Sequence, residues 1–237
     1  MFAYKEVEIF YERSETGSAP VLLLHGWGLN GKAMSGLNHF LSARGKKVIA
    51  PDLPGFGKSF APPESAGIYF YADAVESLMR HENCIGCDVV AHSFGARIAL
   101  ILASRGLIGR LIIADGAGIK PKKTLKSILK TRIYKIRKAL GFNVDKYGSE
   151  DYRALDDHMK KVFVRIVNED LSYLLPEIKN ETLIVWGRTD RETPLYMARK
   201  IKSGITGSEI VLLNGGHFAY LEDSFTFFRV AEAFLCR

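Results

Sequence analysis

A serine stands where an apolar stretch of the chain gives way to small residues. Ser93 directly follows the strand-like residues 89–92, and Gly95 lies two positions after it. A serine on a tight turn between a strand and a helix exposes its hydroxyl group above the edge of a sheet, where it can act as a nucleophile. Ala91 stands where the pattern G-x-S-x-G has its first glycine, and alanine is the smallest departure from it. The pentapeptide alone does not distinguish a nucleophile from a serine that caps a helix.

Two further side chains that a serine nucleophile needs also follow apolar strand patterns. Asp190 comes shortly after the pattern of residues 182–186, and His217 shortly after that of residues 209–213. Open α/β sheets build their sites at the carboxyl ends of strands, so both residues are expected near Ser93. A neutral serine is a weak nucleophile, and a histidine base held by a carboxylate removes its proton during attack. The sequence therefore predicts a catalytic triad of Ser93, His217 as general base and acid, and Asp190 as the residue that orients the imidazole.

A glycine-containing loop follows another predicted strand at the same sheet edge. The strand pattern of residues 21–24 ends in His25-Gly26-Trp27-Gly28. The tetrahedral intermediate of acyl transfer needs hydrogen-bond donors for its oxyanion. We expect the backbone N–H groups of Trp27 and Phe94 to supply them. We also expect the side chains of Trp27, Phe94 and Phe218 to line the substrate pocket.

Taken together, these segments resemble the α/β-hydrolase family in its short form with one domain. The resemblance rests on motifs spread along the chain, namely His25-Gly26-Trp27-Gly28, Pro51-Asp52-Leu53-Pro54-Gly55-Phe56-Gly57-Lys58-Ser59, Ala91-His92-Ser93-Phe94-Gly95, Trp186-Gly187-Arg188-Thr189-Asp190 and Gly216-His217-Phe218. It implies a triad in the chain order Ser, Asp, His and a helical lid inserted before the strand that carries the acid. Because the family hosts many chemistries on one frame, the resemblance does not identify the substrate.

Asp115 is an alternative triad acid. It also follows an apolar strand pattern, that of residues 110–114, and some members of the family carry the acid at this place. Asp190 is preferred because the loop Gly187-Arg188-Thr189-Asp190 matches the family pattern better. His25 and His92 flank the predicted site and are expected to make supporting hydrogen bonds rather than to take part in the chemistry.

The predicted strands and helices alternate along most of the chain, which favours an α/β fold with a mostly parallel, doubly wound sheet of the α/β-hydrolase type. Strands are expected over residues 20–25, 47–50, 87–92, 110–114, 182–186 and 208–213, and helices over residues 31–44, 70–82, 95–105, 194–203 and 219–235. Residues 2–12 alternate in strand fashion and are expected to form an antiparallel edge hairpin. Residues 118–180 lack the alternation and are expected to be helical. We interpret the chain as a hydrolase core, residues 1–117 and 181–237, with a helical lid of residues 118–180.

The positive charge of the chain is concentrated in the first part of the predicted lid. Residues 119–140 contain nine lysines or arginines and no acidic residue, while the whole chain has a net charge of +7. An apolar stripe recurs at helical spacing within them, formed by Leu125, Ile128, Leu129, Ile133, Ile136 and Leu140. Such a helix can cover a pocket or lie on an anionic membrane surface, and covering is favoured because an inserted lid needs an apolar face. No aromatic stacking pattern accompanies the charge, so a nucleic acid is not the expected partner.

The composition agrees with a single globular domain. The chain has 237 residues, of which 47% are hydrophobic and 25% charged. No apolar run approaches the roughly 18 to 20 residues that cross a membrane, and residues 1–8 lack the apolar core of a signal peptide. A cytoplasmic location is therefore expected. The motifs include no metal-ligand set and no cofactor-binding pattern, so catalysis is expected to need neither.

The expected function is that of a serine hydrolase, in which a small-molecule carboxylic ester acylates Ser93 and water then releases the acid. A carbon–carbon bond hydrolase of the meta-cleavage type is an alternative on the same frame. Phe218 stands where that subgroup has tryptophan, and Arg97 is the candidate for its pocket arginine. A non-catalytic ligand receptor is a second alternative, which the presence of all three triad residues disfavours. The basic part of the lid further predicts a substrate with a carboxylate or phosphate group.

Overall fold

Seven strands form the centre of the computed structural model, which describes residues 1–14, 17–121 and 155–236. Across the sheet they follow the order β3 (Tyr11–Arg13), β5 (Lys46–Pro51), β4 (Ala19–Leu24), β6 (Asp88–His92), β7 (Leu111–Ala114), β8 (Thr182–Gly187) and β9 (Glu209–Leu213). β3 pairs antiparallel with β5, and the other neighbouring pairs are parallel. The chain order reverses at β4, so the carboxyl ends of β4 and β6 form the switch point at which open α/β sheets bind ligands.

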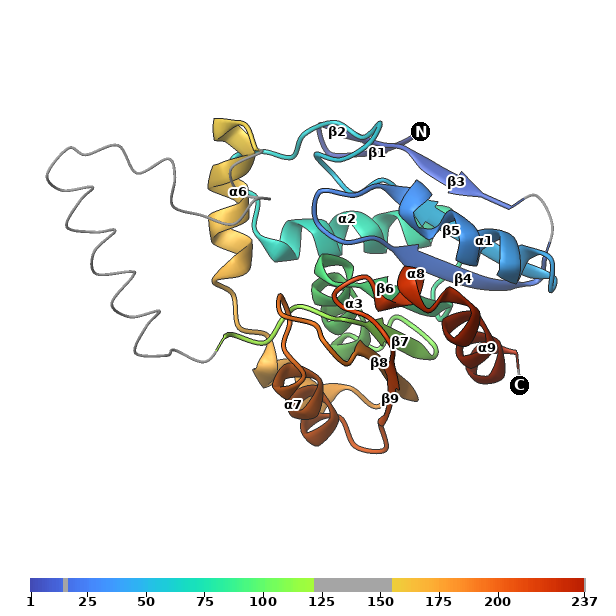
Figure 1. Cartoon of the computed structure of the whole chain (residues 1–237). Helices are drawn as coiled ribbons and strands as arrows, with labels where there is room; N and C mark the ends of the chain where they lie inside the picture. Colours follow the sequence, from blue (N-terminus) through green and yellow to red (C-terminus); the bar gives the residue numbers. More distant parts are fainter. Residues whose placement is uncertain (15–16, 122–154, 237) are drawn as a thin grey trace, which may run out of the picture.

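Helices cover both faces of this sheet (Figure 1). One face carries α2 (Ile68–His81), α3 (Phe94–Ser104) and α7 (Tyr196–Gly204), and the other carries α1 (Ser35–Ser42) and α9 (Ser224–Leu235). Successive strand residues point to opposite faces, as β4 shows. Leu22 and Leu24 join the hydrophobic cluster with α2 and α3, whereas Val21 and Leu23 join the cluster with α1 and α9. Burial on both faces explains why the central strands are apolar throughout.

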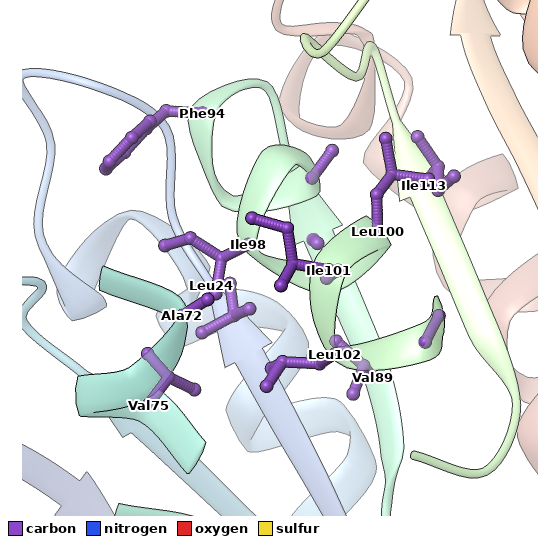
Figure 2. Close-up of a cluster of buried hydrophobic side chains, with 14 of the residues drawn as sticks. Leu24, Ala72, Val75, Val89, Phe94, Ile98, Leu100, Ile101, Leu102 and Ile113 are labelled. Carbon is purple, nitrogen blue, oxygen red and sulfur yellow. The ribbon is translucent and has the colours of Figure 1, made fainter. Parts of the chain in front are cut away.

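Helix α3 is buried over nearly its whole length because it packs between the sheet and α2. Figure 2 shows Ile98 and Leu102 of α3 among side chains of both neighbours, with Leu24 from the sheet and Val75 from α2. All residues from Phe94 to Ala103 are buried. This packing fixes the start of α3, and with it the turn that precedes the helix.

The N-terminal strands differ from the expected edge hairpin. β1 (Phe2–Tyr4) and β2 (Val7–Ile9) pair with each other in a separate two-stranded sheet, and β3 alone joins the main sheet. The two buried side chains of β2 pack with Ala74 of α2, so the hairpin lies against this helix. Alternation predicts strands correctly here, but it does not identify the partner with which each strand pairs.

The helix expected over residues 219–235 is divided in two. α8 (Ala219–Glu222) and α9 are separated by Asp223, whose backbone is not helical. The Glu222 side chain turns back to the preceding loop, where its Oε2 atom accepts a hydrogen bond from the Gly216 N–H at 2.8 Å. Because the apolar pattern continues across the break, periodicity alone predicts a single helix.

Between β7 and β8, the described part of the segment 118–180 contains α6 (Asp157–Val167) and a 3₁₀ helix, η2 (Ser172–Glu177). α6 buries three side chains at helical spacing, Met159, Val162 and Ile166. Figure 1 shows α6 at the left, to one side of the sheet, while η2 packs against α3 and α7. The predicted basic helix and its apolar stripe lie outside the described residues, apart from residues 119–121. Among the residues that are described, no helix is long and apolar enough to span a membrane.

Candidate active site

Ser93 lies at the sharp turn between β6 and α3. Its backbone angles are φ 46° and ψ −108°, a conformation that L-residues rarely adopt and that costs on the order of 1–3 kcal/mol. The turn brings α3 close to β4, and a Cβ atom on Gly95 would lie 2.5 Å from the Leu24 carbonyl oxygen, so this position requires glycine. The Gly95 N–H donates to the His25 carbonyl at 3.1 Å, which ties the start of α3 to the loop after β4. The strained turn therefore places Ser93 at the switch point of the sheet.

The structure brings Ser93 together with the predicted histidine and acid. His217 Nε2 lies 2.9 Å from Ser93 Oγ, and His217 Nδ1 lies 3.0 Å from Asp190 Oδ2. A carboxylate can only accept hydrogen bonds, so Nδ1 carries the proton of the neutral ring and Nε2 accepts the serine hydroxyl. This chain of contacts is the arrangement in which a histidine removes a proton from a serine.

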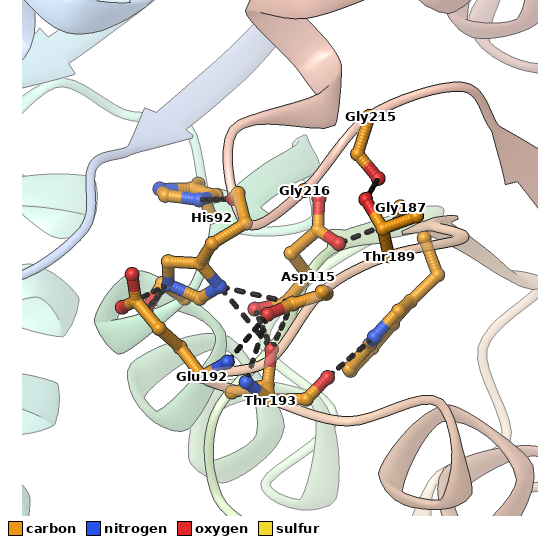
Figure 3. Close-up of polar contacts among 12 residues, drawn as sticks. His92, Asp115, Gly187, Thr189, Glu192, Thr193, Gly215 and Gly216 are labelled. Carbon is orange, nitrogen blue, oxygen red and sulfur yellow. Dashed lines mark hydrogen bonds and ion pairs between the residues drawn. The ribbon is translucent and has the colours of Figure 1, made fainter.

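Asp190 is held by the loop that follows it, whose residues Glu192 and Thr193 are labelled in Figure 3. Its Oδ1 atom accepts the backbone N–H groups of Glu192 at 2.8 Å and Thr193 at 3.0 Å, and its Oδ2 atom accepts the Thr193 hydroxyl at 2.6 Å. Burial raises the pKa of Asp190, but the hydrogen bonds from His217 and Thr193 outweigh burial and hold this pKa below its ordinary value. The carboxylate therefore stays ionised and can stabilise an imidazolium.

A second carboxylate faces the imidazole. Glu192 Oε2 lies 3.4 Å from His217 Nε2, the nitrogen that also faces Ser93, and the Glu192 side chain is 59% exposed. Burial lowers the pKa of His217, but the hydrogen bond to Asp190 and the charges of Asp190, Glu192 and Asp115 outweigh burial and raise it. Sequence reasoning did not identify Glu192, because a glutamate in a polar loop has no distinguishing spacing.

Asp115, the alternative acid, lies at the end of β7 and contacts the backbone. Its Oδ1 atom accepts the Gly187 N–H at 2.7 Å, and the residue is 1% exposed. Burial raises its pKa to about 8, so the carboxyl group is protonated at neutral pH. The acid hydrogen-bonded to His217 Nδ1 is Asp190, which agrees with the preference drawn from the loop pattern.

The two flanking histidines make hydrogen bonds that support the loops of the site. His25 Nδ1 donates to the Gly26 carbonyl at 2.7 Å, and His25 Nε2 accepts the Leu53 N–H at 2.9 Å. His92 Nε2 donates to the His217 carbonyl at 2.8 Å. Burial lowers the pKa of His25 to about 4 and that of His92 to about 3, so both rings are neutral. His92 thus holds the backbone carbonyl group of His217, the candidate base.

The predicted oxyanion donors, Trp27 and Phe94, both line the cavity that contains Ser93. Among the residues that the structure describes, neither backbone N–H meets a hydrogen-bond acceptor. Backbone N–H groups in a folded chain are nearly always paired. Two unpaired N–H groups beside a serine therefore fit a site that binds a developing oxyanion.

A cavity of about 490 Å³ contains Ser93 and His217, whereas Asp190 lies behind His217 and is not part of its lining. It is lined by Trp27, Ser93, Phe94, Arg97, Ala117, Phe163, Ile166, Val167, Glu192, Thr193 and His217. This volume suits a small to medium ligand. A larger hollow of about 820 Å³ lies between α6 and residues 64–65, but charged groups that pair with each other line it, such as Lys161 and Glu64.

The lining of the cavity differs in part from the sequence expectation. Phe218 is not among the lining residues, and its ring packs against the His92 ring, with centroids 5.3 Å apart. The chain turns at His217, so the next side chain points elsewhere. Phe163, Ile166 and Val167 of α6 were missed, although the amphipathic spacing of α6 was a signal for them.

Residues 21–230 match the family model of the alpha/beta hydrolase family. This match covers most of the chain, so the protein belongs to the alpha/beta hydrolase family. The parallel sheet with helices on both faces, predicted from the alternation of strands and helices, is confirmed as the fold of this family.

Curated relatives of similar length are hydrolases. The chain is 29% identical over 252 residues to the AB hydrolase superfamily protein YisY of Bacillus subtilis, and 92% of each chain is covered. It is 28% identical over 247 residues to the 2-hydroxymuconate semialdehyde hydrolase of Pseudomonas putida, with 91% of this chain and 86% of the relative covered. An esterase from Exiguobacterium antarcticum has a similar structure, with a TM-score of 0.79, 22% identity and coverage of 98% and 96%. This last similarity shows the fold.

Proposed function

We propose that this protein is a serine hydrolase that cleaves a carboxylic ester through an acyl-enzyme on Ser93. The observation that carries the proposal is the 2.9 Å contact between Ser93 Oγ and His217 Nε2 within a cavity of about 490 Å³. The ionised Asp190 on the other imidazole nitrogen supports it, because this carboxylate stabilises the charge that the ring gains during attack.

The first half of the reaction is acylation of Ser93, with His217 as the base. Ser93 Oγ forms a bond to the ester carbonyl carbon while its proton passes to His217 Nε2. The oxyanion accepts hydrogen bonds from the N–H groups of Trp27 and Phe94. The intermediate collapses when the bond to the alkoxy group breaks, and this group leaves as the alcohol with the proton from Nε2.

Deacylation repeats these steps with water. Water attacks the acyl carbon and gives one proton to His217 Nε2. The bond between the carbon and Ser93 Oγ then breaks, and the serine recovers the proton. The carboxylic acid is released, and Ser93 and His217 return to their initial protonation states. The reaction consumes only the ester and water.

We assign a covering role to the segment 118–180, with residues 1–117 and 181–237 as the core. Support comes from α6, which contributes Phe163, Ile166 and Val167 to the lining of the cavity. Trp27 of the core meets the Phe163 ring nearly edge-on, with centroids 5.0 Å apart. The segment therefore supplies apolar surface to the substrate, and the strand ends supply the chemistry.

A panel of p-nitrophenyl esters with short to long acyl chains tests the proposal. Wild-type protein is expected to hydrolyse some of them, and Ser93→Ala is expected to lose about 10⁴-fold or more in kcat. Ser104→Ala is the matched control, because Ser104 lies at the far end of α3 and donates to the Ile101 carbonyl. Turnover that persists in Ser93→Ala would contradict the proposal.

A carbon–carbon bond hydrolase is the second candidate, and the similarity to the 2-hydroxymuconate semialdehyde hydrolase favours it. The same triad and oxyanion donors would serve an aldehyde or ketone carbonyl next to the carbon–carbon bond that breaks. Loss of the visible absorbance of 2-hydroxymuconate semialdehyde would support this candidate, and ester turnover without it would exclude it. If neither substrate reacts and a fluorophosphonate fails to label Ser93, the ligand-receptor alternative replaces both.

A further inference from the structure

Arg97 is the one charged residue of the described helix α3, and the other residues from Phe94 to Ala103 are apolar. It lies one helical turn after Ser93, and both residues line the cavity. The steps of acylation and deacylation do not use Arg97. A charge at this place therefore needs another explanation.

The Arg97 side chain is buried and its described partner is a carbonyl group. The residue is 6% exposed, and its Nη1 atom donates to the Glu169 carbonyl at 2.9 Å. No carboxylate of the described residues lies within ion-pair distance of it. Burial lowers its pKa to about 10, so the guanidinium stays charged at neutral pH. The charges of Glu169 and Asp170 favour the charged form, but neither carboxylate forms an ion pair with the guanidinium, so an anion in the cavity would stabilise this buried cation further.

Glu192, the second charged residue of the cavity apart from the histidine, indicates which part of a substrate can carry a negative charge. Glu192 lies beside His217 Nε2, the atom that delivers a proton to the leaving group. A negative charge on the leaving group would be repelled by Glu192, whereas a negative charge elsewhere on the substrate would be attracted to Arg97. The charges thus favour a substrate whose acyl part carries the anion.

We propose that Arg97 binds a carboxylate at the far end of the acyl group, so that the preferred substrates are monoesters of short dicarboxylic acids. This proposal rests on the proposed ester hydrolysis at Ser93. A planar guanidinium has five N–H donors and can hold a carboxylate in a bidentate fashion while it keeps its bond to Glu169.

A purely structural role for Arg97 makes a different prediction. The hydrogen bond to the Glu169 carbonyl connects α3 to the chain that follows α6. Such a connection needs a donor but no charge. Its loss would reduce the hydrolysis of neutral and anionic esters to the same extent, whereas loss of a carboxylate anchor would reduce only the anionic ones.

The experiment compares 4-nitrophenyl hydrogen glutarate with 4-nitrophenyl pentanoate, which have the same acyl length and differ in the terminal carboxylate. Wild type is expected to prefer the glutarate, with a preference that weakens in high salt. Arg97→Gln is expected to lower kcat/KM for the glutarate about 10- to 100-fold and to leave that for the pentanoate within about threefold. Arg97→Lys should recover part of the preference. Equal losses on both esters, or no preference in wild type, would overturn the proposal.

Arg105→Gln is the matched control on the same helix. Arg105 follows α3, is partly exposed, and pairs with Asp73 and Glu76 outside the cavity. It should leave the ratio between the two esters unchanged. If Arg97→Gln does not fold, inhibition of wild-type pentanoate hydrolysis decides instead, because glutarate should compete and neutral glutaramide should not.

A binding measurement separates this proposal from ester hydrolysis itself. Glutarate is expected to raise the Tm of wild type and of Ser93→Ala, but not that of Arg97→Gln. A shift that depends on Arg97 in a protein that turns over neither ester would support the anchor and contradict ester hydrolysis. No shift in wild type would contradict the anchor, whatever the activity.

Discussion

Asp115 directly follows β7 and Asp190 comes three residues after the end of the neighbouring strand β8, yet their carboxyl groups are in opposite states. Asp190 is ionised and contacts His217 Nδ1 at 3.0 Å. Asp115 is buried, has a pKa raised to about 8, and accepts the Gly187 N–H. Position after a strand is therefore not sufficient to define the acid of a triad.

The difference follows from the donors that surround each carboxyl group. Asp190 accepts two backbone N–H groups, the Thr193 hydroxyl and the imidazole. Asp115 has a backbone φ of 46°, and its carboxyl group accepts one N–H group, that of Gly187, while its hydrogen bond with the Asp190 side chain favours the neutral form. Hydrogen bonds to the charged form favour it, and burial without enough of them favours the neutral form.

Exchange of the two carboxyl groups for amides gives the largest expected contrast. Asp190→Asn should lower kcat/KM by about 10³- to 10⁴-fold, because the amide can no longer hold the productive tautomer or stabilise the imidazolium. Asp115→Asn should stay within about tenfold of wild type, since its neutral carboxyl group is replaced by a neutral amide of similar shape. Both are measured on the best p-nitrophenyl ester. A larger loss of kcat/KM in Asp115→Asn than in Asp190→Asn would show that Asp115, after β7, is the acid of the triad.

The two aspartates should also change stability with pH in opposite directions. The folded pKa of Asp115 lies above its unfolded value of 3.8, so the folded state binds the extra proton and stability falls as pH rises from about 4 to about 8. The folded pKa of Asp190 is lowered, so its contribution is present above its unfolded value and is lost as pH falls through the folded value. In urea unfolding between these pH values, Asp115→Asn should remove a slope of up to about 1.4 kcal/mol per pH unit. An unchanged slope would mean that Asp115 is ionised in the folded protein.

A smaller effect is expected from the Thr193 hydroxyl group, which contacts the side chain of Asp190 but only the backbone carbonyl of Asp115. Thr193→Val removes the 2.6 Å hydrogen bond to Asp190 Oδ2 and should raise the pKa of this acid and lower kcat/KM about tenfold. Thr193→Ser keeps the hydroxyl group and should remain close to wild type. A Val variant as active as the Ser variant would show that the backbone donors suffice to hold the acid.

The smallest effect is expected at Glu192, an exposed neighbour of the imidazole. Its charge contributes to the raised pKa of His217, so Glu192→Gln should lower this pKa and move the acidic limb of the kcat/KM profile to lower pH. The gain in rate on that limb should be less than tenfold, because exposed ion pairs are weak. A limb that moves to higher pH would contradict the sign of this contribution.

The fold and the three candidate triad residues could be predicted because each depends on a local pattern. Ser93 directly follows the buried strand β6, and His217 comes four residues after the end of β9. In a parallel sheet the carboxyl ends of the strands lie at the same edge. The loop pattern favoured Asp190 over Asp115 as the acid. The hydrogen-bond donors that keep Asp190 charged, however, depend on how this loop folds. The contributions of Phe163 and Glu192 depend on contacts between distant segments, which spacing along the chain does not record.

The break between α8 and α9 connects the last helix to the candidate base. Glu222, at the end of α8, holds the Gly216 N–H, one residue before His217. Beyond it, the final carbonyl groups of α9 accept hydrogen bonds from Lys46 and Arg110 beside the sheet. Because α9 also buries Phe227, Ala231 and Leu235 against the sheet, unfolding of this helix would disturb the core and, through the neighbouring Glu222, the histidine loop together.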